Sequence, residues 1–425
     1  MVRIKKRGHF FPIFYPDHPT ILLFFNASAL SQLCGFALIS WMLWIYALIP
    51  CMAWAESSLE NDSMLFQAKT IAKTYAPLVA KASPPNPAPQ TEALLTYASN
   101  WFSIDLATVE TKEKSVLETL ANPLLWECLA QIGIDGVELK GLKSQGPQSH
   151  FQIDPKWGTE ANYRNLANEA SKKGICLIGK IIGNATGKGA DFALALKNVG
   201  SYPELYAMVE IAPQDWDLLP EVSHRTFAAN IPWLTVQKLH NKGYIPTHFE
   251  PYVKESSWNA TEPISGDGKI RRWIYLRDEL GFPYLDWLNP SFGALRLAAA
   301  DCLYSLFALG QPILQFDPLP QNAEQTLALT ARKLGAFSTA VVTGGVDALD
   351  RCTDSTYDHL LPMATLHAIL TEDVEILRLI YQLLLEKNIQ PKRLVHALEP
   401  FGRNPSDWAE FLHSPKKNMS IIKKK

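Results

Sequence analysis

The chain has few cysteines, little net charge and no glycine-rich phosphate loop. The cysteines beyond residue 55 (Cys128, Cys176, Cys302 and Cys352) show no C-x-x-C spacing, so neither a zinc site nor a redox pair is indicated, and a disulfide has no support from the pattern. The formal net charge of -2 implies no nucleic-acid partner. No G-x-G-x-x-G turn or Walker loop follows a predicted strand, which argues against nucleotide folds. We therefore expect no cofactor and no metal.

The composition is that of a globular protein. The 425 residues are 47% hydrophobic and 19% charged. This length suits one large domain of α/β-barrel size or two ordinary domains.

The N-terminus has the pattern of a targeting segment. Basic "MVRIKKRGHF" precedes an apolar stretch that ends at Ala55, and Ala53 and Ala55 make an A-x-A pattern. We expect residues 1–55 to be a signal peptide. The apolar run of about 20 residues is also long enough to cross a bilayer, so an uncleaved anchor at residues 35–55 is the alternative. Both predict export, whether periplasmic, secreted or luminal, and membrane contact only through this segment.

Residues 56–95 are expected to form a helix and a linker. "SMLFQAKTIAKTYAPLVAKA" favours a helix, and "SPPNPAPQTE" is a proline-rich linker that cannot continue it. The folded body is expected to start near Trp101, within residues 96–413. The basic tail, residues 414–425, is expected to be a frayed end without function.

From Trp101 onward, helical patterns alternate with short apolar strands. A helical segment ending at Gly133 precedes the strand "IDGVELKGL", and one ending at Gly174 precedes "ICLIGKIIG". Similar units lead into "QPILQF", "AFSTAVV" and "RLVHALEPFG". At least five such units predict parallel strands covered by helices, and they favour a TIM-type (β/α)8 barrel over an open doubly wound sheet.

In a barrel, function lies at the carboxyl ends of the strands. Asp317 directly follows the buried strand "QPILQF", where an unpaired carboxylate is costly. The other strand-end candidates are Lys140, Lys143, Lys180, Asn184, Gln315, Val341, Thr343, Tyr357, Asp358, Glu399 and Arg403.

Two long segments resemble the alpha-amylase family of glycoside hydrolases. "FQIDPKWGTEANYRNLANEASKKGICLIGKIIGNATG" is similar to the family's stretch leading to the third strand, and "PYLDWLNPSFGALRLAAADCLYSLFALGQPILQFD" to the stretch leading to the fourth. The shorter "GDGKIRRWIYL", "KLGAFS", "STYDHLL" and "RLVHALEPF" resemble the trehalose-synthase-like branch. The resemblance runs from about Trp101 to Phe401, and it implies a barrel acting on α-glucosides such as maltose or trehalose.

The family's catalytic positions are mostly replaced. Its fourth strand carries Arg-x-Asp, and this chain has Gln315-Phe316-Asp317, so the resemblance implies that the nucleophile position is kept without its arginine. On the third strand Lys180 replaces the family's aspartate, while Asn184 is retained and Ala185 replaces the histidine. Val341 or Val342 occupies the place of the glutamic acid. The family's Asn-His-Asp on the seventh strand reads Pro400-Phe401-Gly402.

This loss predicts a catalytically degenerate barrel. Retaining glycosidases need one carboxyl group to attack and another to protonate the leaving group, and valine cannot transfer a proton. We therefore expect a pseudoenzyme that binds a glycan or a protein. The alternative is an active α-glucoside hydrolase or a glucosyltransferase or isomerase, in which Glu399, Asp354 or Asp358 replaces the missing acid.

The expected binding residues surround Asp317. "ICLIGK" should lie parallel to "PILQF", and Lys180 should form an ion pair with Asp317. The predicted substrate-binding residues are Asn184, Gln315, Lys180, Tyr357, Asp358 and Trp287. Asp317 could instead cap a helix, and Asn184 could stabilise a turn. Trp157, Trp258, Trp273 and Trp287 could stack on sugar rings or pack in the core.

Two architectural features complete the prediction. Residues at about 186–309 form a long insertion between the third and fourth strands, where the resemblance implies a substrate-covering subdomain. No segment reads clearly as an eighth strand, so the barrel is expected to be incomplete at its last strand.

Overall fold

The structure is a computed structural model of the chain. It describes residues 58–81, 100–111, 114–143, 150–222, 227–252, 257–266, 268–342, 346–358, 360–389 and 393–396.

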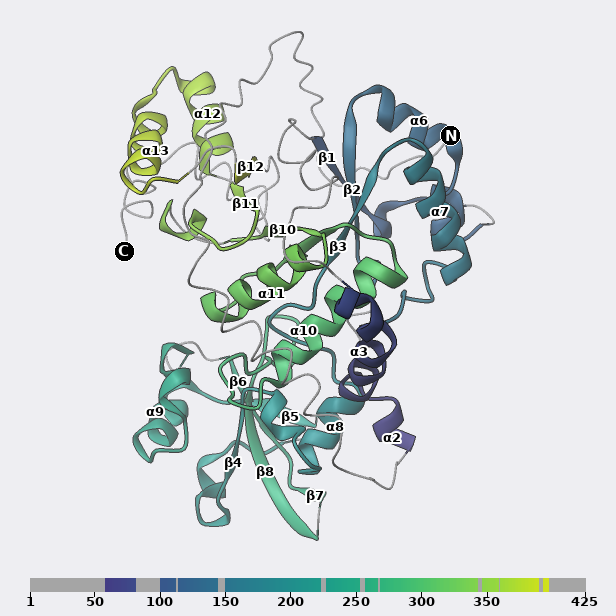
Figure 1. The fold of residues 1–425 in the computed structure, drawn as a ribbon. Helices are drawn as coiled ribbons and strands as arrows, with labels where there is room; N and C mark the ends of the chain where they lie inside the picture. Colours follow the sequence, from purple (N-terminus) through teal and green to yellow (C-terminus); the bar gives the residue numbers. More distant parts are fainter. Residues whose placement is uncertain are drawn as a thin grey trace.

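The main sheet has seven parallel strands in the order β1-β2-β3-β9-β10-β11-β12 (Figure 1). The strands follow one another in chain order, as they do in the wall of an incomplete (β/α)8 barrel. Their bounds are Asn100–Asp105, Ile134–Lys140, Cys176–Lys180, Ile313–Phe316, Phe337–Ala340, Ser355–Asp358 and Leu394–His396.

The pairing of β3 with β9 confirms the sequence prediction. The two strands are parallel and adjacent, with Ile178 beside Ile313 and Lys180 beside Gln315. The carboxyl ends of both strands therefore lie on the same side of the sheet. The 132 residues between Lys180 and Ile313 return the chain to this neighbouring position.

The helices that cover the sheet are α5 (Val116–Leu120), α6 (Pro123–Gln131), α7 (Glu160–Lys172), α10 (Gly293–Leu303), α11 (Gln321–Lys333), α12 (Leu360–Thr371) and α13 (Glu375–Glu386). Local sequence sets several of their ends. The side chain of Asn122 accepts from the Leu124 backbone N–H at the start of α6, and Thr159 and Asn162 form a reciprocal capping box on α7. Gly174, with a φ of +74°, allows the turn from α7 into β3.

Two parts of the main sheet differ from the prediction. Strand β1 was not predicted, because "NWFSID" mixes polar and apolar residues at the edge of the sheet. Between β10 and β11 the described residues contain only the 3₁₀ turn Val346–Leu349 in place of an α-helix. Within the part of the chain that is described, β1 and β12 do not pair with each other.

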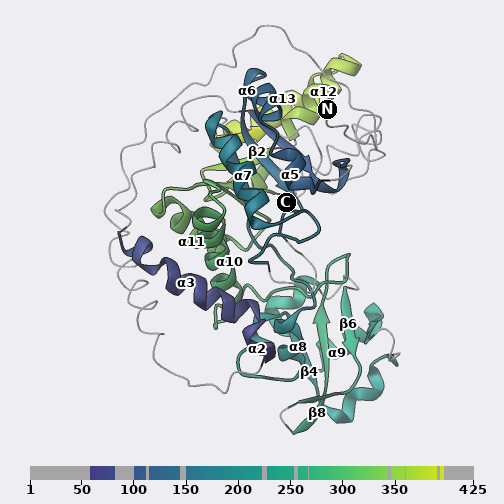
Figure 2. The same cartoon turned by 90° about the vertical axis from the view of Figure 1, so that its right-hand side faces the viewer.

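A second, five-stranded antiparallel sheet lies between β3 and β9 in sequence and to one side of the main sheet in space (Figures 1 and 2). Its strands are Met208–Ile211 (β4), Ala228–Asn230 (β5), Trp258–Thr261 (β6), Ile264–Gly266 (β7) and Lys269–Leu276 (β8), flanked by α8 (Ala190–Leu196) and α9 (Trp233–Asn241). The segment predicted as an insertion, residues 186–309, also includes α10, which packs with the main sheet in one hydrophobic core.

The folded part begins before Trp101. After the short α2 (Ser58–Asn61), the predicted helix is present as α3 (Met64–Lys81), which packs against α10 with Met64 and Ala68 buried. The amphipathic pattern of "SMLFQAKTIAKTYAPLVAKA" thus reflects packing against the body.

Several predictions concern residues outside the described ranges. These are the signal peptide or anchor (residues 1–55), the linker (residues 83–92), Thr343, the Pro400-Phe401-Gly402 segment, Glu399, Arg403, an eighth strand and the basic tail (residues 414–425). In the described ranges, no helix combines the length and the hydropathy needed to cross a membrane.

Candidate functional site

The main sheet has two different faces. Leu139, Leu177, Leu314 and Phe316 point to the helices and join their hydrophobic core. Alternate residues point to the other face, which we call the inner face. Ile178, Ile313 and Phe337 form a small apolar cluster there. Two residues further along β3, β9 and β10, the same face carries the polar side chains of Lys180, Gln315 and Thr339.

Lys180 and Asp317 form an ion pair at the carboxyl ends of β3 and β9. The Lys180 Nζ lies 3.1 Å from the Asp317 Oδ1, which confirms the predicted proximity. The Lys180 side chain is 43% exposed and that of Asp317 is 26% exposed, so solvent reaches both groups. A carboxylate held by a lysine is a poorer nucleophile than a free one, because attack requires that the ion pair be broken.

Gly183 makes room for the Asp317 side chain. A Cβ atom added at Gly183 would lie 3.1 Å from the Asp317 Cβ and closer still to its Oδ2. The backbone after β3 therefore forms one wall of the Asp317 position.

A row of polar side chains crosses the inner face level with Gln315, which lies two residues before Asp317. Lys180, Gln315, Thr339 and Ser355 are register partners across β3, β9, β10 and β11, and all but Lys180 are buried. Gln315 and Thr339 are fully buried, and within the described residues neither Gln315 amide atom nor the Thr339 hydroxyl has a hydrogen-bond partner. An unsatisfied buried polar group typically costs about 1–3 kcal/mol.

Val341 directly follows β10 and lies beside Asp317, which directly follows β9. Its N–H donates to the Phe316 carbonyl at 2.8 Å, and alternation from Thr339 turns its side chain to the inner face. Val342 instead joins the core of α12 and α13. Of the two valines considered from sequence, Val341 is the one next to Asp317, and it offers no proton.

Glu138 is an inner-face carboxyl group that was not among the residues predicted for the site. It lies on β2, is 6% exposed and accepts a hydrogen bond from the Ser103 hydroxyl at 3.0 Å. Burial raises the pKa of Glu138 above its usual value; Lys140, Ser103 and Lys180 oppose this rise, and Asp317 adds to it. An acidic residue between Val137 and Leu139 was the available signal, since a carboxyl group inside a buried strand needs a reason.

Tyr357 and Asp358 occupy opposite faces of β11. Tyr357 packs its ring 6.2 Å from that of Trp101, and burial raises the pKa of its hydroxyl above the usual value. Asp358 is fully buried and accepts from the backbone N–H groups of Leu360 and Leu361 at the start of α12. Its other oxygen lies 3.0 Å from the His396 Nδ1. The Asp358 carboxylate is therefore already bonded within the fold.

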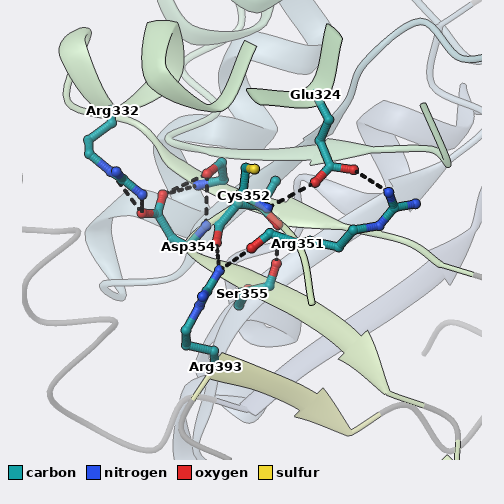
Figure 3. Close-up of polar contacts among 9 residues, drawn as sticks. Glu324, Arg332, Arg351, Cys352, Asp354, Ser355 and Arg393 are labelled. Carbon is teal, nitrogen blue, oxygen red and sulfur yellow. Dashed lines mark hydrogen bonds and ion pairs between the residues drawn. The ribbon is translucent and has the colours of Figure 1, made fainter. Parts of the chain in front are cut away.

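Asp354 directly precedes β11, so it lies at the amino ends of the parallel strands, whereas Asp317 lies at their carboxyl ends. Arg332 donates to it at 2.7 Å (Figure 3). The N–H and hydroxyl of Ser338 donate to its other oxygen. In the same region Glu324 accepts a hydrogen bond from the Cys352 N–H and forms an ion pair with Arg351 (Figure 3). This network fixes the segment that enters β11 and places Asp354 away from the candidate site.

Asn184 and the tryptophans have mainly structural contacts. The Asn184 carbonyl accepts from the Leu285 N–H at 2.8 Å, in the turn that follows β3. Trp287 is partly buried against the main core, and among the described residues its Nε1 has no hydrogen-bond partner. Trp258 is fully buried in the core of the second sheet, and Trp273 is 5% exposed. Trp157 donates to the Gly141 carbonyl at 2.6 Å.

The site thus contains an accessible ion pair and a buried carboxyl group. The described residues contain no group of three or more His, Cys, Asp or Glu side chains that could hold a metal ion. Binding of hydroxyl-rich molecules and proton transfer by Glu138 are the chemistry that these side chains offer.

No protein-family profile and no curated protein matches the chain. Among solved structures, it is similar to the alpha-amylase of Geobacillus thermoleovorans solved with acarbose (15% identity, 67% of this chain, 54% of that chain, TM-score 0.39). It is also similar to the ligand-free cyclic alpha-maltosyl-(1→6)-maltose hydrolase of Arthrobacter globiformis (15% identity, 75% of this chain, 59% of that chain, TM-score 0.44). The chain spans about half the length of these enzymes. A likeness this distant assigns no activity.

Proposed function

We propose that the chain is an alpha-amylase-type barrel protein, closest to the trehalose-synthase-like branch, that binds an α-glucoside or a related glycan and has lost hydrolytic activity. The two long sequence segments that resemble this family support the ancestry. A protein partner at the same face is the second form of the proposal. Export through residues 1–55 belongs to it as well.

The Lys180–Asp317 ion pair is the observation that carries the proposal. It sits where the resemblance places the nucleophile, with a separation of 3.1 Å. Val341 beside it cannot donate a proton, and Gln315 below it carries no charge to orient the carboxylate. General acid catalysis is typically worth about a hundred- to ten-thousand-fold, so its loss alone lowers turnover strongly.

Calorimetric titration of the full chain with maltose and trehalose tests the binding role. We expect heat of binding for at least one sugar, and weaker binding in Asp317→Asn. Asp154→Asn is the matched control, because Asp154 also pairs with a lysine, Lys156, but lies in the segment before α7 and not at the end of a sheet strand. Equal affinity in both variants would place the sugar elsewhere, and absence of sugar binding would leave only the protein-partner form.

Release of sugar tests the lost activity. The full chain should release no glucose from maltose or trehalose. An aryl α-glucoside has a leaving group that needs no protonation, so it asks only whether Asp317 can attack. We expect no burst of aryl alcohol. Robust hydrolysis of a natural disaccharide by the wild type, abolished by Asp317→Asn, would contradict the loss of activity and support the alternative of an active enzyme.

Glu138 favours the alternative of an active enzyme. A buried carboxyl group with a raised pKa is a candidate proton donor, and it is electrostatically coupled to Asp317. If Glu138 were the acid, Glu138→Gln would abolish trehalose cleavage but spare cleavage of the aryl glucoside. Loss or retention of both activities together would exclude that role.

A further inference from the structure

A buried ionic cluster lies behind the candidate site. Lys143, one of the strand-end candidates, points its Nζ to the Asp301 Oδ1 at 2.6 Å and to the Ser305 Oγ at 2.9 Å. The His150 Nε2 lies 3.1 Å from the other Asp301 oxygen, Oδ2. Burial opposes ionisation of Asp301, but Lys143 and His150 hold its pKa below the usual value.

Asp301 also bonds the backbone that walls the Asp317 position. The Ile182 N–H donates to the Asp301 Oδ2 at 2.8 Å. The next residue is Gly183, whose backbone lies against Asp317 so closely that a Cβ atom would not fit. Helix α10 is thereby connected to the Lys180–Asp317 pair. The connection consists of the hydrogen bond from Ile182 to Asp301 and the peptide unit that joins Ile182 to Gly183.

We infer that Asp301 is a positioning residue for Asp317, acting through the Ile182–Gly183 backbone. This inference rests on the proposed function only in its claim that Asp317 contacts a ligand. The fixed backbone keeps the carboxylate beside Lys180 and presents it at one position to a bound sugar. Removing the acceptor at Asp301 frees the backbone and lets the carboxylate move.

Single substitutions at Asp301 are a poor test. They leave Lys143 buried without its partner, and an uncompensated buried charge commonly prevents folding. A matched pair of double variants avoids this problem. Lys143→Met with Asp301→Asn retains an oxygen that can accept from Ile182, whereas Lys143→Met with Asp301→Leu retains none. Asn and Leu have shapes close to that of Asp, so the two proteins differ mainly in whether an oxygen remains to face the Ile182 N–H and the His150 Nε2.

The readout is the ¹³C chemical shift of the Asp317 side-chain carboxyl, assigned by its absence in Asp317→Asn. We expect the Asn double variant to keep the wild-type shift and the Leu double variant to change it. In the Leu double variant, sugar affinity should also fall about tenfold, as expected for the loss of one hydrogen bond that holds a binding group. Asp354→Asn, in the network of Figure 3, is the stability control: it should lower the melting temperature without moving the Asp317 signal.

The outcomes separate the two proposals. An unchanged Asp317 shift in the folded Leu double variant would overturn the positioning role, whether or not any sugar binds. If wild-type protein binds no sugar but the shift still changes only in the Leu double variant, the positioning role stands and the glycan-binding role fails. Equal changes of the shift in both double variants would assign the effect to the lost charges and would also overturn the inference.

Discussion

At the scale of single residues, the site is defined by which side chains are paired. Three carboxylates form ion pairs: Asp317 with Lys180, Asp301 with Lys143, and Asp354 with Arg332. Within the described ranges, Glu138 accepts a hydrogen bond from the Ser103 hydroxyl, and the charges of Lys140 and Lys180 lie nearby. The buried amide of Gln315 has no partner among the described residues.

Gly183→Ala should displace Asp317. The new Cβ would overlap the Asp317 carboxylate, so the ion pair with Lys180 must break or the backbone must shift. We expect at least tenfold weaker sugar binding and a loss of about 1–3 kcal/mol in the free energy of unfolding, measured by calorimetry and urea denaturation. In an Asp317→Ala background the same substitution should cost clearly less, because the overlapping oxygen is gone. Additive effects of the two substitutions would contradict the contact.

Thr339→Val should stabilise the protein. The Thr339 hydroxyl is fully buried and lacks a partner in the described structure, so replacing it with a methyl group removes a desolvation cost. We expect a gain of about 1 kcal/mol in the free energy of unfolding. The neighbouring Ser338→Ala is the control: the Ser338 hydroxyl donates to Asp354 at 2.7 Å, so its removal should destabilise. A destabilising Thr339→Val would mean that its hydroxyl has a bonding partner.

At the scale of elements, a buried carboxylate connects α3 to α8. Asp191 is 1% exposed and accepts from the N–H groups of Met64 at 2.6 Å and Leu65 at 3.0 Å. These donors are otherwise free at the first turn of a helix. Burial raises the pKa of Asp191 to about 6, although the two N–H bonds oppose the shift.

This pKa predicts a stability that falls as the pH rises. Between the unfolded value of 3.8 and about 6 the folded state binds the proton more tightly, so its contribution is full below pH 3.8 and is lost by about pH 6. The whole effect is about 3 kcal/mol. Asp191→Asn should remove this dependence, so its unfolding free energy relative to wild type should rise by most of that amount between pH 4 and pH 7. Asp62→Asn, an exposed carboxylate in the neighbouring turn, should leave the dependence unchanged. Parallel pH profiles for wild type and Asp191→Asn would contradict the assignment.

At the scale of the whole molecule, the N-terminal helix is part of the folded body. Met64 and Ala68 of α3 are buried in the main core, and Tyr75 stacks on Phe307 with ring centroids 5.2 Å apart. A chain that begins at residue 96 should therefore be less stable than one that begins at residue 56, by about 2–4 kcal/mol from lost apolar burial. Urea denaturation measures the difference. Equal stability of the two chains would show that α3 contributes nothing to the body.

Much of the secondary structure was predictable because its causes are local. Caps, glycine ends and apolar periodicity lie within a dozen residues of each other, and they indicated α6, α7, α10, α11 and α13 with the strands that follow them. Strand β1 and the connection between β10 and β11 were not predictable, because their state depends on neighbouring strands. The Lys180–Asp317 pair was predictable only through the family resemblance, since 136 residues separate its two members.

The sequence by itself determined the parallel α/β class, the order of the covering helices and the isolated Asp317 at the end of its strand. Only the tertiary structure decided which face each strand residue occupies: it placed Glu138 on the face of Asp317, turned Asp358 away from it, and set the Gly183 backbone between Asp301 and Asp317. The physical reason is the distance along the chain over which each interaction acts. Helix and strand formation follow from neighbours along the chain, whereas burial, pairing and pKa depend on side chains that only the folded backbone brings together.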